Sequence, residues 1–270
     1  LLINSFTFNF RFMLSKIKDF PKISIITATQ NSELFLEECI ESVINQSYLN
    51  IEYIIVDGQS TDKTIEIIKK KEKYISRWIS EKDDGLYDAL NKGVKIATGD
   101  YIGFLHSDDI FADADVIKKI ANILKSNQYD LVHSNLKIVE SSNVLNQKRF
   151  VKLPNFNLFK LKIGLIPPHP TIYYRRKIHE HVGYYDNSYH IAGDYDMILR
   201  MMMTGKIKER YLNINSIIMR DGGKSNSGLM SKIKINMEIL KSARKNKFET
   251  NLFFLLLKIP KRIIEYLINK

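Results

Sequence analysis

The sequence contains very little cysteine and lacks any apolar run long enough to cross a membrane. Cys39 is the only cysteine among the 270 residues, so an internal disulfide and a multi-cysteine metal site are both excluded. A single cysteine fits a reducing compartment, and Cys39 itself is interpreted as a buried helix residue. The longest apolar stretch, 252–257, ends at Lys258, which is far short of the ~20 residues that a spanning helix needs.

Two glycine-rich nucleotide-binding motifs are also absent. No GxGxxG follows the first apolar segment, 22–28, and no GxxxxGK[ST] occurs anywhere in the chain. Their absence argues against a dinucleotide-dependent enzyme and against a P-loop NTPase. A nucleotide can still bind through carboxylates and a metal ion.

The first twelve residues lack the basic start and the small-residue cleavage site of a signal peptide. They also precede Met13. We therefore expect natural translation to begin at Met13, and we treat 1–20 as an amino-terminal extension. Amino-terminal sequencing of protein expressed from the native gene checks this, since a mature chain that retains 1–12 contradicts it.

Positive charge is in excess, with 41 Lys and Arg against 30 Asp and Glu and a formal net charge of +11. Many of the lysines lie beside apolar clusters in the last third of the chain, which favours an anionic membrane surface over a nucleic-acid groove. Packing of the helical segment 231–270 on the core, or against a second copy in a homodimer, is the other interpretation, and both stay open. No motif that reads nucleic acid accompanies the charge, so no nucleic-acid partner is expected.

Strand and helix patterns alternate from 22 to 110. Apolar, mostly β-branched segments at 22–28 and 51–56 and the apolar run 101–105 predict buried strands. Amphipathic segments lie between them, and the connections are short. This is the pattern of an α/β protein with a doubly wound, mostly parallel sheet. In such sheets ligands bind beyond the carboxyl ends of the strands.

Polar residues gather at the predicted strand ends and in the connecting loops. These positions are Thr29-Gln30-Asn31, Asp57-Gly58, Asp83-Asp84-Gly85 and Ser107-Asp108-Asp109. Adjacent carboxylates after a buried strand are unfavourable unless a cation meets them. Hard oxygen ligands suit a divalent metal ion, so the run at 107–109 predicts a metal site.

Four segments together resemble glycosyltransferase family 2. They are ISIITATQN, IIVDGQSTDKT, DDGLYDALNKGVKIATGDYIGFLHSDD and IAGDYDMILR, in the family's order and approximate spacing. The resemblance spans about 22–226 and is nearest to bacterial enzymes that build cell-surface polysaccharides. It implies the GT-A fold, a Rossmann-like mostly parallel sheet followed by C-terminal helices. The implied domain covers 21–230, with a nucleotide-binding half at 21–110, an acceptor half at 111–230 and the helical tail 231–270.

The resemblance also implies roles for individual residues. It implies a set of residues around the nucleotide of a nucleotide-sugar, which in most members is a UDP-sugar. These residues are Thr27, Ala28, Thr29, Asp57, Asp84, Gly85, Asn91, Lys92 and Asp108. Asp57 matches the acid that contacts the base, and Asp109 matches the ligand of Mn²⁺ or Mg²⁺, with Asp108 directed towards ribose or donor sugar. Asp194, in GDYD, matches the general base of an inverting transfer.

Two positions depart from the family pattern. Ser107 stands at the first position of the Asp-x-Asp motif, and Gly193 stands where an acid commonly precedes the base. In an extended segment Ser107 and Asp109 share one face, so metal binding is expected to rest on Asp109, diphosphate oxygens and water. Asp194 is also well placed to cap the following helix, and Asp196 is the fallback base. The alternative role of either residue is a first-turn acid that the helix dipole favours.

The resulting prediction is an inverting transferase of cell-surface polysaccharide biosynthesis. It moves a sugar to a glycan or lipid-linked glycan in the cytoplasm, and where the tail meets lipid rather than the core, the contact is expected through 250–270 at the inner face of the cytoplasmic membrane. His169 and 221–225 are expected to border the acceptor.

Three other functions share some of these sequence features. A catalytically impaired nucleotide-binding or scaffold protein of a polysaccharide assembly complex stays open because of the two departures. A processive synthase is disfavoured, since the Gln-x-x-Arg-Trp motif and membrane helices are missing. A nucleotidyltransferase is disfavoured, because the loop after the first strand is TATQNSE rather than rich in Gly, Lys and Arg.

Overall fold

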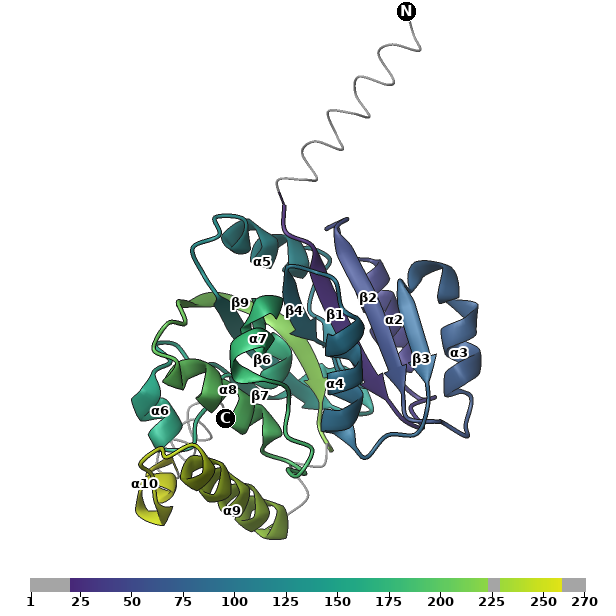
Figure 1. Cartoon of the computed structure of the whole chain (residues 1–270). Coiled ribbons are helices and arrows are strands. Elements are labelled where there is room, and N and C mark those ends of the chain that lie inside the picture. Colours follow the sequence, from purple (N-terminus) through teal and green to yellow (C-terminus); the bar gives the residue numbers. More distant parts are fainter. Residues whose placement is uncertain (1–19, 223–228, 259–270) are drawn as a thin grey trace, which may run out of the picture.

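The computed structural model describes residues 20–222 and 229–258 (Figure 1). The start expected at Met13, residues 223–225 of the predicted acceptor border and residues 259–270 of the predicted lipid contact lie outside the described residues.

The described part of the chain is organised around a nine-stranded sheet in the order β3-β2-β1-β4-β8-β6-β9-β5, with β7 paired to β6. The strands are β1 (Ile23–Thr29), β2 (Ile51–Asp57), β3 (Arg77–Ser80), β4 (Tyr101–Phe104), β5 (Ile110–Phe111), β6 (Leu131–Glu140), β7 (Asn143–Val151), β8 (Tyr173–Arg175) and β9 (Glu209–Arg220). The three predicted strands at 22–28, 51–56 and 101–105 are confirmed as β1, β2 and β4.

The first half of the sheet is parallel and the second half is mixed. Strands β3, β2, β1 and β4 run parallel to one another, so their carboxyl ends meet at one edge. Beyond β4, the short strand β8 is antiparallel to both β4 and β6, whereas β9 is again parallel to β6. The predicted α/β class is confirmed, and the parallel half positions the polar strand ends together.

Helices cover both faces of the sheet. They are α2 (Leu36–Ile44), α3 (Thr64–Lys70), α4 (Leu86–Ile96), α5 (Val116–Leu124), α6 (Leu158–Lys162), α7 (His179–Val182), α8 (Gly193–Met203), α9 (Leu229–Lys245) and α10 (Leu252–Leu256). Strand β1 is apolar on both sides because both faces of the sheet are covered. Ile25 packs in the core under α2, α3 and α5, whereas Ile26 packs under α4 and α8. Figure 1 shows α4 in front of β1 and α2 behind the sheet.

The carboxyl-terminal helices pack on the domain. Ile239 and Ala243 of α9 and Leu255 of α10 are fully or almost fully buried, and Lys258 Nζ donates to Asn236 Oδ1 at 2.7 Å. Packing of the tail on the core is therefore confirmed within the described residues. None of the helices described here is long and apolar enough to cross a membrane.

Candidate active site

The site is built on the shared carboxyl edge of the parallel strands. In the sheet register Thr29 lies opposite Asp57, and Asp57 lies opposite Ser80. The ends of β1, β2 and β3 therefore form one row. The loop that follows β4 continues this row with His106 to Asp109, because β4 is parallel to β1.

Residues His106 to Asp109 form a tight turn, in which the Asp109 N–H donates to the His106 carbonyl at 3.0 Å. The extended conformation assumed for this segment was wrong, because the chain turns here to enter β5. As a result the two acids lie in different environments. Asp109 has 0% exposed surface, whereas Asp108 is partly exposed.

Three contacts hold this turn in place. Ser107 Oγ lies 2.9 Å from Ser32 Oγ in the loop after β1, and Cys39 Sγ donates to the His106 carbonyl at 3.3 Å. Arg220, at the end of β9, donates from Nη1 to the Asp108 carbonyl at 2.7 Å. The serine at the position where an acid was expected thus connects two loops of the site.

The carboxylate of Asp109 lacks any hydrogen-bond partner on either oxygen. Burial raises its pKa well above the usual range, and the neighbouring charge of Asp108 adds to the effect. An unpaired buried carboxylate beside a second carboxylate fits a divalent cation. Within 20–222 and 229–258, however, no three His, Cys, Asp or Glu side chains converge on one point, so these residues offer only part of a metal's ligand set.

Among the nucleotide contacts predicted on β1 and β2, some lie at this edge and others are turned into the protein. Asp57 is fully buried, and its carboxylate accepts from Ser60 N–H at 3.0 Å, Ser60 Oγ at 2.5 Å and Ser80 Oγ at 2.6 Å. Thr27 points into the core, where its hydroxyl lies 3.2 Å from Tyr53 Oη. Thr29 and the half-buried Ala28 lie at the edge itself.

Asp83 belongs to one of the predicted polar clusters, although the resemblance implied a role only for its neighbours Asp84 and Gly85. A side chain at Gly58 would come within 2.4 Å of Asp83 Oδ2, which places this carboxylate directly against the end of β2. Asp84 and Gly85 are exposed, and the Asp84 N–H donates to Asp88 Oδ2 at 3.3 Å. The glycine after Asp57 was the available signal, since close approach by another group requires the absence of a side chain there.

Asn91 and Lys92 have partners that lie away from the turn. The Asn91 amide donates to the Tyr185 carbonyl at 2.8 Å and accepts from the Tyr185 N–H at 2.9 Å. Lys92 Nζ lies 3.0 Å from Glu81 and 3.4 Å from Asp88. The diphosphate contact predicted for both residues stays a prediction, and in this structure Asn91 fixes the segment that leads to α8.

Asp194 lies in the first turn of α8 and is not its N-cap, because the helix begins one residue earlier, with Ala192 at the cap position. Its Oδ1 accepts from the Tyr195 N–H at 2.7 Å. Burial raises the pKa of Asp194 to about 6, and the charge of Glu238 adds to this. A carboxyl group with such a pKa is suited to accept a proton near neutral pH.

The fallback base, Asp196, is not available for catalysis. It is 1% exposed, and its carboxylate accepts from Arg200 Nε at 2.8 Å, Ser242 Oγ at 2.7 Å and Asn246 Nδ2 at 3.0 Å. Asp196 therefore connects α8 to α9, and Asp194 is the candidate base.

A row of aromatic side chains joins the turn to the Asp194 segment. The rings of His106 and His169 stack with centroids 5.9 Å apart, and His169 Nε2 lies 2.9 Å from Tyr185 Oη. Tyr185 stacks on Tyr87 at 5.7 Å, and Tyr87 Oη donates to the Ile191 carbonyl at 2.7 Å. Burial lowers the pKa of His169 to about 3, so this row is uncharged at neutral pH.

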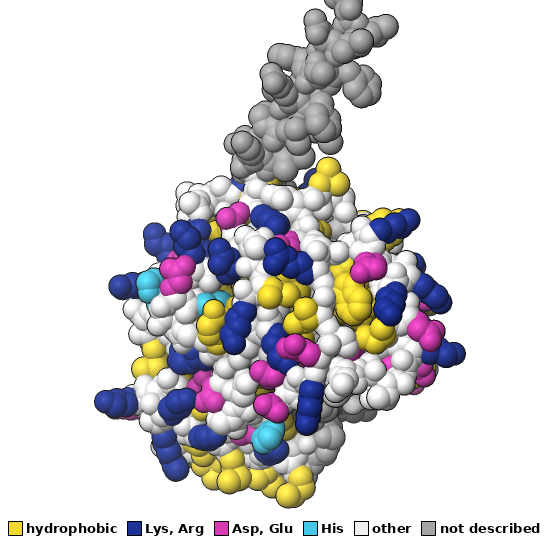
Figure 2. Space-filling view, turned by 45° about the vertical axis from the view of Figure 1, so that its right-hand side comes forward, with side chains coloured by type: hydrophobic (Ala, Val, Ile, Leu, Met, Phe, Trp, Pro, Cys, Tyr) yellow, Lys and Arg dark blue, Asp and Glu magenta, His cyan; other side chains and the backbone are white. Residues whose placement is uncertain are grey.

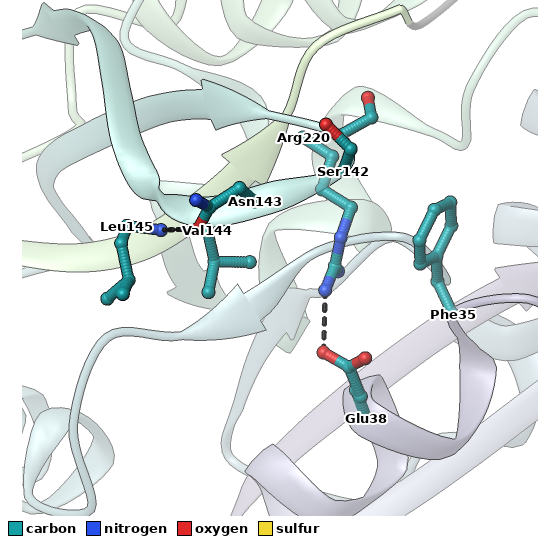
Figure 3. A pocket seen from close by; sticks show the side chains of 8 residues that line it. Phe35, Glu38, Ser142, Asn143, Val144, Leu145 and Arg220 are labelled. Carbon is teal, nitrogen blue, oxygen red and sulfur yellow. Dashed lines mark hydrogen bonds and ion pairs between the residues drawn. The ribbon is translucent and has the colours of Figure 1, made fainter.

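Arg220 also lines a pocket of about 610 Å³, which lies between α2 and the β6–β7 hairpin. In Figure 3 the guanidinium of Arg220 points to Glu38, and Nη2 lies 2.6 Å from Glu38 Oε2. The same group lies over the ring of Phe35, 4.4 Å from its centroid. Asp221, at the predicted acceptor border, pairs with Lys148.

The family model for Glycosyl transferase family 2 matches residues 24–183. The chain belongs to glycosyltransferase family 2. It is 30% identical over 198 residues to a "PGL/p-HBAD biosynthesis glycosyltransferase" of Mycobacterium bovis, covering 72% of this chain and 75% of that protein. It is 36% identical over 159 residues to a glycosyltransferase of Haemophilus influenzae, covering 54% and 62% of the two chains.

Solved structures with the same architecture include S. aureus TarS 1-349 in complex with UDP-GlcNAc. The TM-score is 0.65 at 20% identity, over 82% of this chain and 66% of that one, and the chain spans 43% of a longer TarS chain. The mannosyltransferase PcManGT of Pyrobaculum calidifontis, in complex with GDP-Man and Mn²⁺, has a TM-score of 0.60 at 18% identity, over 86% of this chain and 65% of that one. These likenesses confirm the GT-A fold of this glycosyltransferase.

Proposed function

We propose that this glycosyltransferase moves a sugar from a nucleotide-sugar, with inversion, onto a hydroxyl group of a glycan or lipid-linked glycan. The observation that carries the proposal is the aromatic row His106–His169–Tyr185–Tyr87. It connects the acidic turn, where a donor diphosphate would be held, to the segment that presents Asp194.

The acidic turn is proposed to hold the metal end of the donor. Asp108 is the acid that a ligand can reach, and Asp109 lies buried and unpaired behind it. This burial favours Asp108 as the direct ligand and Asp109 as a buried acid behind it, whereas the resemblance implied Asp109 as the ligand and Asp108 towards ribose or donor sugar. Bound Mn²⁺ or Mg²⁺ would stabilise negative charge on the leaving diphosphate as a Lewis acid.

Asp194 is proposed to act as the general base. An acceptor hydroxyl is a weak nucleophile until its proton is removed, and a base in position contributes typically 10²–10⁴-fold to the rate. Asp194 is partly exposed, so its carboxylate can reach a bound hydroxyl. The Asp194→Asn variant should abolish sugar transfer while donor binding is kept, and near wild-type turnover by this variant would remove the assignment.

A UDP-sugar is the proposed donor. Asp83, whose carboxylate lies against Gly58 at the end of β2, offers oxygens that can accept from the N–H of a uracil ring. A panel of UDP- and GDP-sugars with Mn²⁺, read by thermal shift, tests this, since a ligand that binds only the folded state raises the Tm. Stabilisation by GDP-sugars alone would overturn the choice of UDP.

An anionic membrane surface is proposed to hold the acceptor, which places the enzyme at the inner face of the cytoplasmic membrane. Figure 2 shows apolar side chains gathered along the lower edge of the molecule, at the height where Figure 1 places α9 and α10. The exposed apolar residues of these helices are Met230, Ile233, Met237, Leu252, Phe253 and Leu256, and Leu257 directly follows α10. Exposed apolar side chains among lysines are typical of helices that lie in a membrane interface.

Flotation of the full chain with liposomes that contain anionic lipid tests this surface. Phe253→Glu should weaken binding, because Phe253 is 68% exposed and its insertion would be lost. Leu145→Glu is the matched control, since Leu145 is 87% exposed but lies on the β7 hairpin. Equal binding by both variants and the wild type would exclude the helices as the membrane contact.

One observation supports a second candidate function. The absence of exposed surface on Asp109 is also expected of a nucleotide-binding scaffold protein that has lost turnover. Metal-dependent hydrolysis or transfer of UDP-sugars by the purified chain would exclude this alternative.

A further inference from the structure

Glu238 of α9 accepts hydrogen bonds from consecutive backbone amides of the segment before α8. Its Oε2 accepts from the N–H groups of His190 at 3.2 Å, Ile191 at 2.9 Å and Ala192 at 2.8 Å. Its Oε1 accepts from His190 N–H at 3.1 Å. Glu238 is 8% exposed. The carboxylate thus satisfies the buried amide of Ala192, together with the less buried amides of His190 and Ile191.

These amides immediately precede the helix that carries Asp194. The cap residue of α8, Ala192, has no side chain that can bond to the helix. Glu238 is 46 residues away in sequence from Ala192 and supplies negative charge at this helix terminus, where it is favourable. The start of α8 is therefore fixed by a side chain from another helix.

The residue next to Asp194 cannot supply an acid itself. A Cβ atom at Gly193 would lie 2.7 Å from Cε2 and Cζ of Tyr87, so Tyr87 excludes any side chain there. Tyr87 Oη also donates to the Ile191 carbonyl at 2.7 Å. The segment before Asp194 is held between Tyr87 on one side and Glu238 on the other.

We propose that Glu238 is a positioning residue for Asp194, which makes α9 part of the catalytic machinery of this enzyme. The inference rests on the proposed function, in which Asp194 is the general base. Glu238 acts through the backbone of 190–192, which sets the direction of the Asp194 side chain, and through its negative charge.

The charge of Glu238 also affects protonation of Asp194. The titratable groups that face Asp194 are Tyr87 from α4, Tyr185 from the segment before α8 and Glu238 from α9. Burial is the main cause of the raised pKa of Asp194, and repulsion from Glu238 adds to it. Burial tends to raise the pKa of Glu238, but hydrogen bonds from the backbone amides of 190–192, helped by the charge of Lys234, lower it, so the glutamate stays charged where Asp194 titrates.

Glu238→Gln and Glu238→Ala separate the two effects. The glutamine can keep an oxygen towards Ile191 and Ala192 but has no charge, so the acid limb of the kcat profile should move to lower pH. The alanine frees the segment, and kcat should fall about 10- to 100-fold, as expected for misplacement of a catalytic group, with the donor KM unchanged. Ser242→Ala is the matched control, because Ser242 Oγ also connects α9 to α8, through Asp196 at 2.7 Å.

Hydrogen exchange of the full chain gives a readout that does not depend on activity. The amides of 190–192 should lose protection in Glu238→Ala and keep it in Ser242→Ala. Unchanged pH profiles, kcat and protection in both Glu238 variants would overturn the proposal, as would equal effects of Ser242→Ala. If Asp194→Asn itself keeps full turnover, the proposed base fails instead, and the exchange result still reports on the Glu238 contact.

Discussion

The hydroxyl oxygens of Ser32 and Ser107 lie 2.9 Å apart and join the loop after β1 to the turn that carries Asp108. Ser107 occupies the position where the family resemblance led us to expect an acid. Its observed contact gives this position a structural purpose, because the two loops border the donor edge from neighbouring strands. A carboxylate at 107 is therefore not needed to shape the site.

The Ser32–Ser107 contact should be measurable as a coupling in stability. Ser32→Ala and Ser107→Ala are each expected to lower the free energy of unfolding by about 1 kcal/mol, the usual net value of one hydrogen bond. The double variant should lose little more than either single one, because both remove the same bond. Urea unfolding measures this, and fully additive losses would show that the two hydroxyls act independently.

Metal binding should depend differently on the two acids of the turn. Asp108→Asn is expected to abolish the Mn²⁺-dependent rise in Tm measured with UDP present, because it removes the acid that a ligand can reach. Asp109→Asn should raise the Tm in metal-free buffer at neutral pH, since burial raises the pKa of Asp109 well above its usual range and folding must therefore protonate it, which an amide does not require. Asp113→Asn, at an acid paired with Lys119, is the control and should change neither. A full Mn²⁺ response in Asp108→Asn would return the ligand role to Asp109.

The pH dependence of sugar transfer should report Asp194. A base must be deprotonated to act, and the pKa of Asp194 is raised to about 6. The rate should therefore rise with pH through about 6 and level off above it, and Asp194→Asn should lower kcat by about 10²–10⁴-fold. Steady-state kinetics from pH 5 to 8 measure this limb, which an exposed carboxylate of ordinary pKa would place about two units lower.

Glu52 should make the fold sensitive to acid. Burial tends to raise its pKa, but hydrogen bonds from Ser24, Thr98 and Lys22 outweigh burial and lower the pKa to about 2. Because the folded pKa is lower than the unfolded one, this stability is present above about pH 4.5 and is lost as the pH falls towards 2, an effect of about 3 kcal/mol. Urea unfolding of wild type and Glu52→Gln at pH 7 and pH 3 should show a difference that shrinks in acid. A constant difference would exclude the ionised carboxylate as its source.

The strands of the nucleotide-binding half were predictable because their signal is local. The apolar segments 22–28, 51–56 and 101–105 correspond to Ile23–Thr29, Ile51–Asp57 and Tyr101–Phe104. Alternate residues pack on opposite faces of a sheet covered by helices on both sides, so a continuous apolar run is what such a strand requires. The parallel order then brings Thr29 and Asp57 to one edge.

The environment of each acid was not predictable in the same way. In the pairs Asp83-Asp84 and Asp108-Asp109 the two residues are identical, so the sequence does not indicate which carboxylate faces the site. Asp109 is buried because of the turn geometry and the packing around it. Asp83 lies at the end of β2 because Gly58 has no side chain to keep its carboxylate away. Such choices depend on contacts between loops that are distant in sequence.

By itself, the sequence determined the alternation of strands and helices, the family and the edge of the sheet where the chemistry gathers. It could do so because apolar periodicity and short motifs are properties of neighbouring residues. The tertiary structure alone decided which acids are reachable, that Asp196 is engaged with Arg200, and that Glu238 fixes the segment before Asp194. These properties arise from hydrogen bonds and burial between separate elements, which exist only when the sheet and its helices have packed.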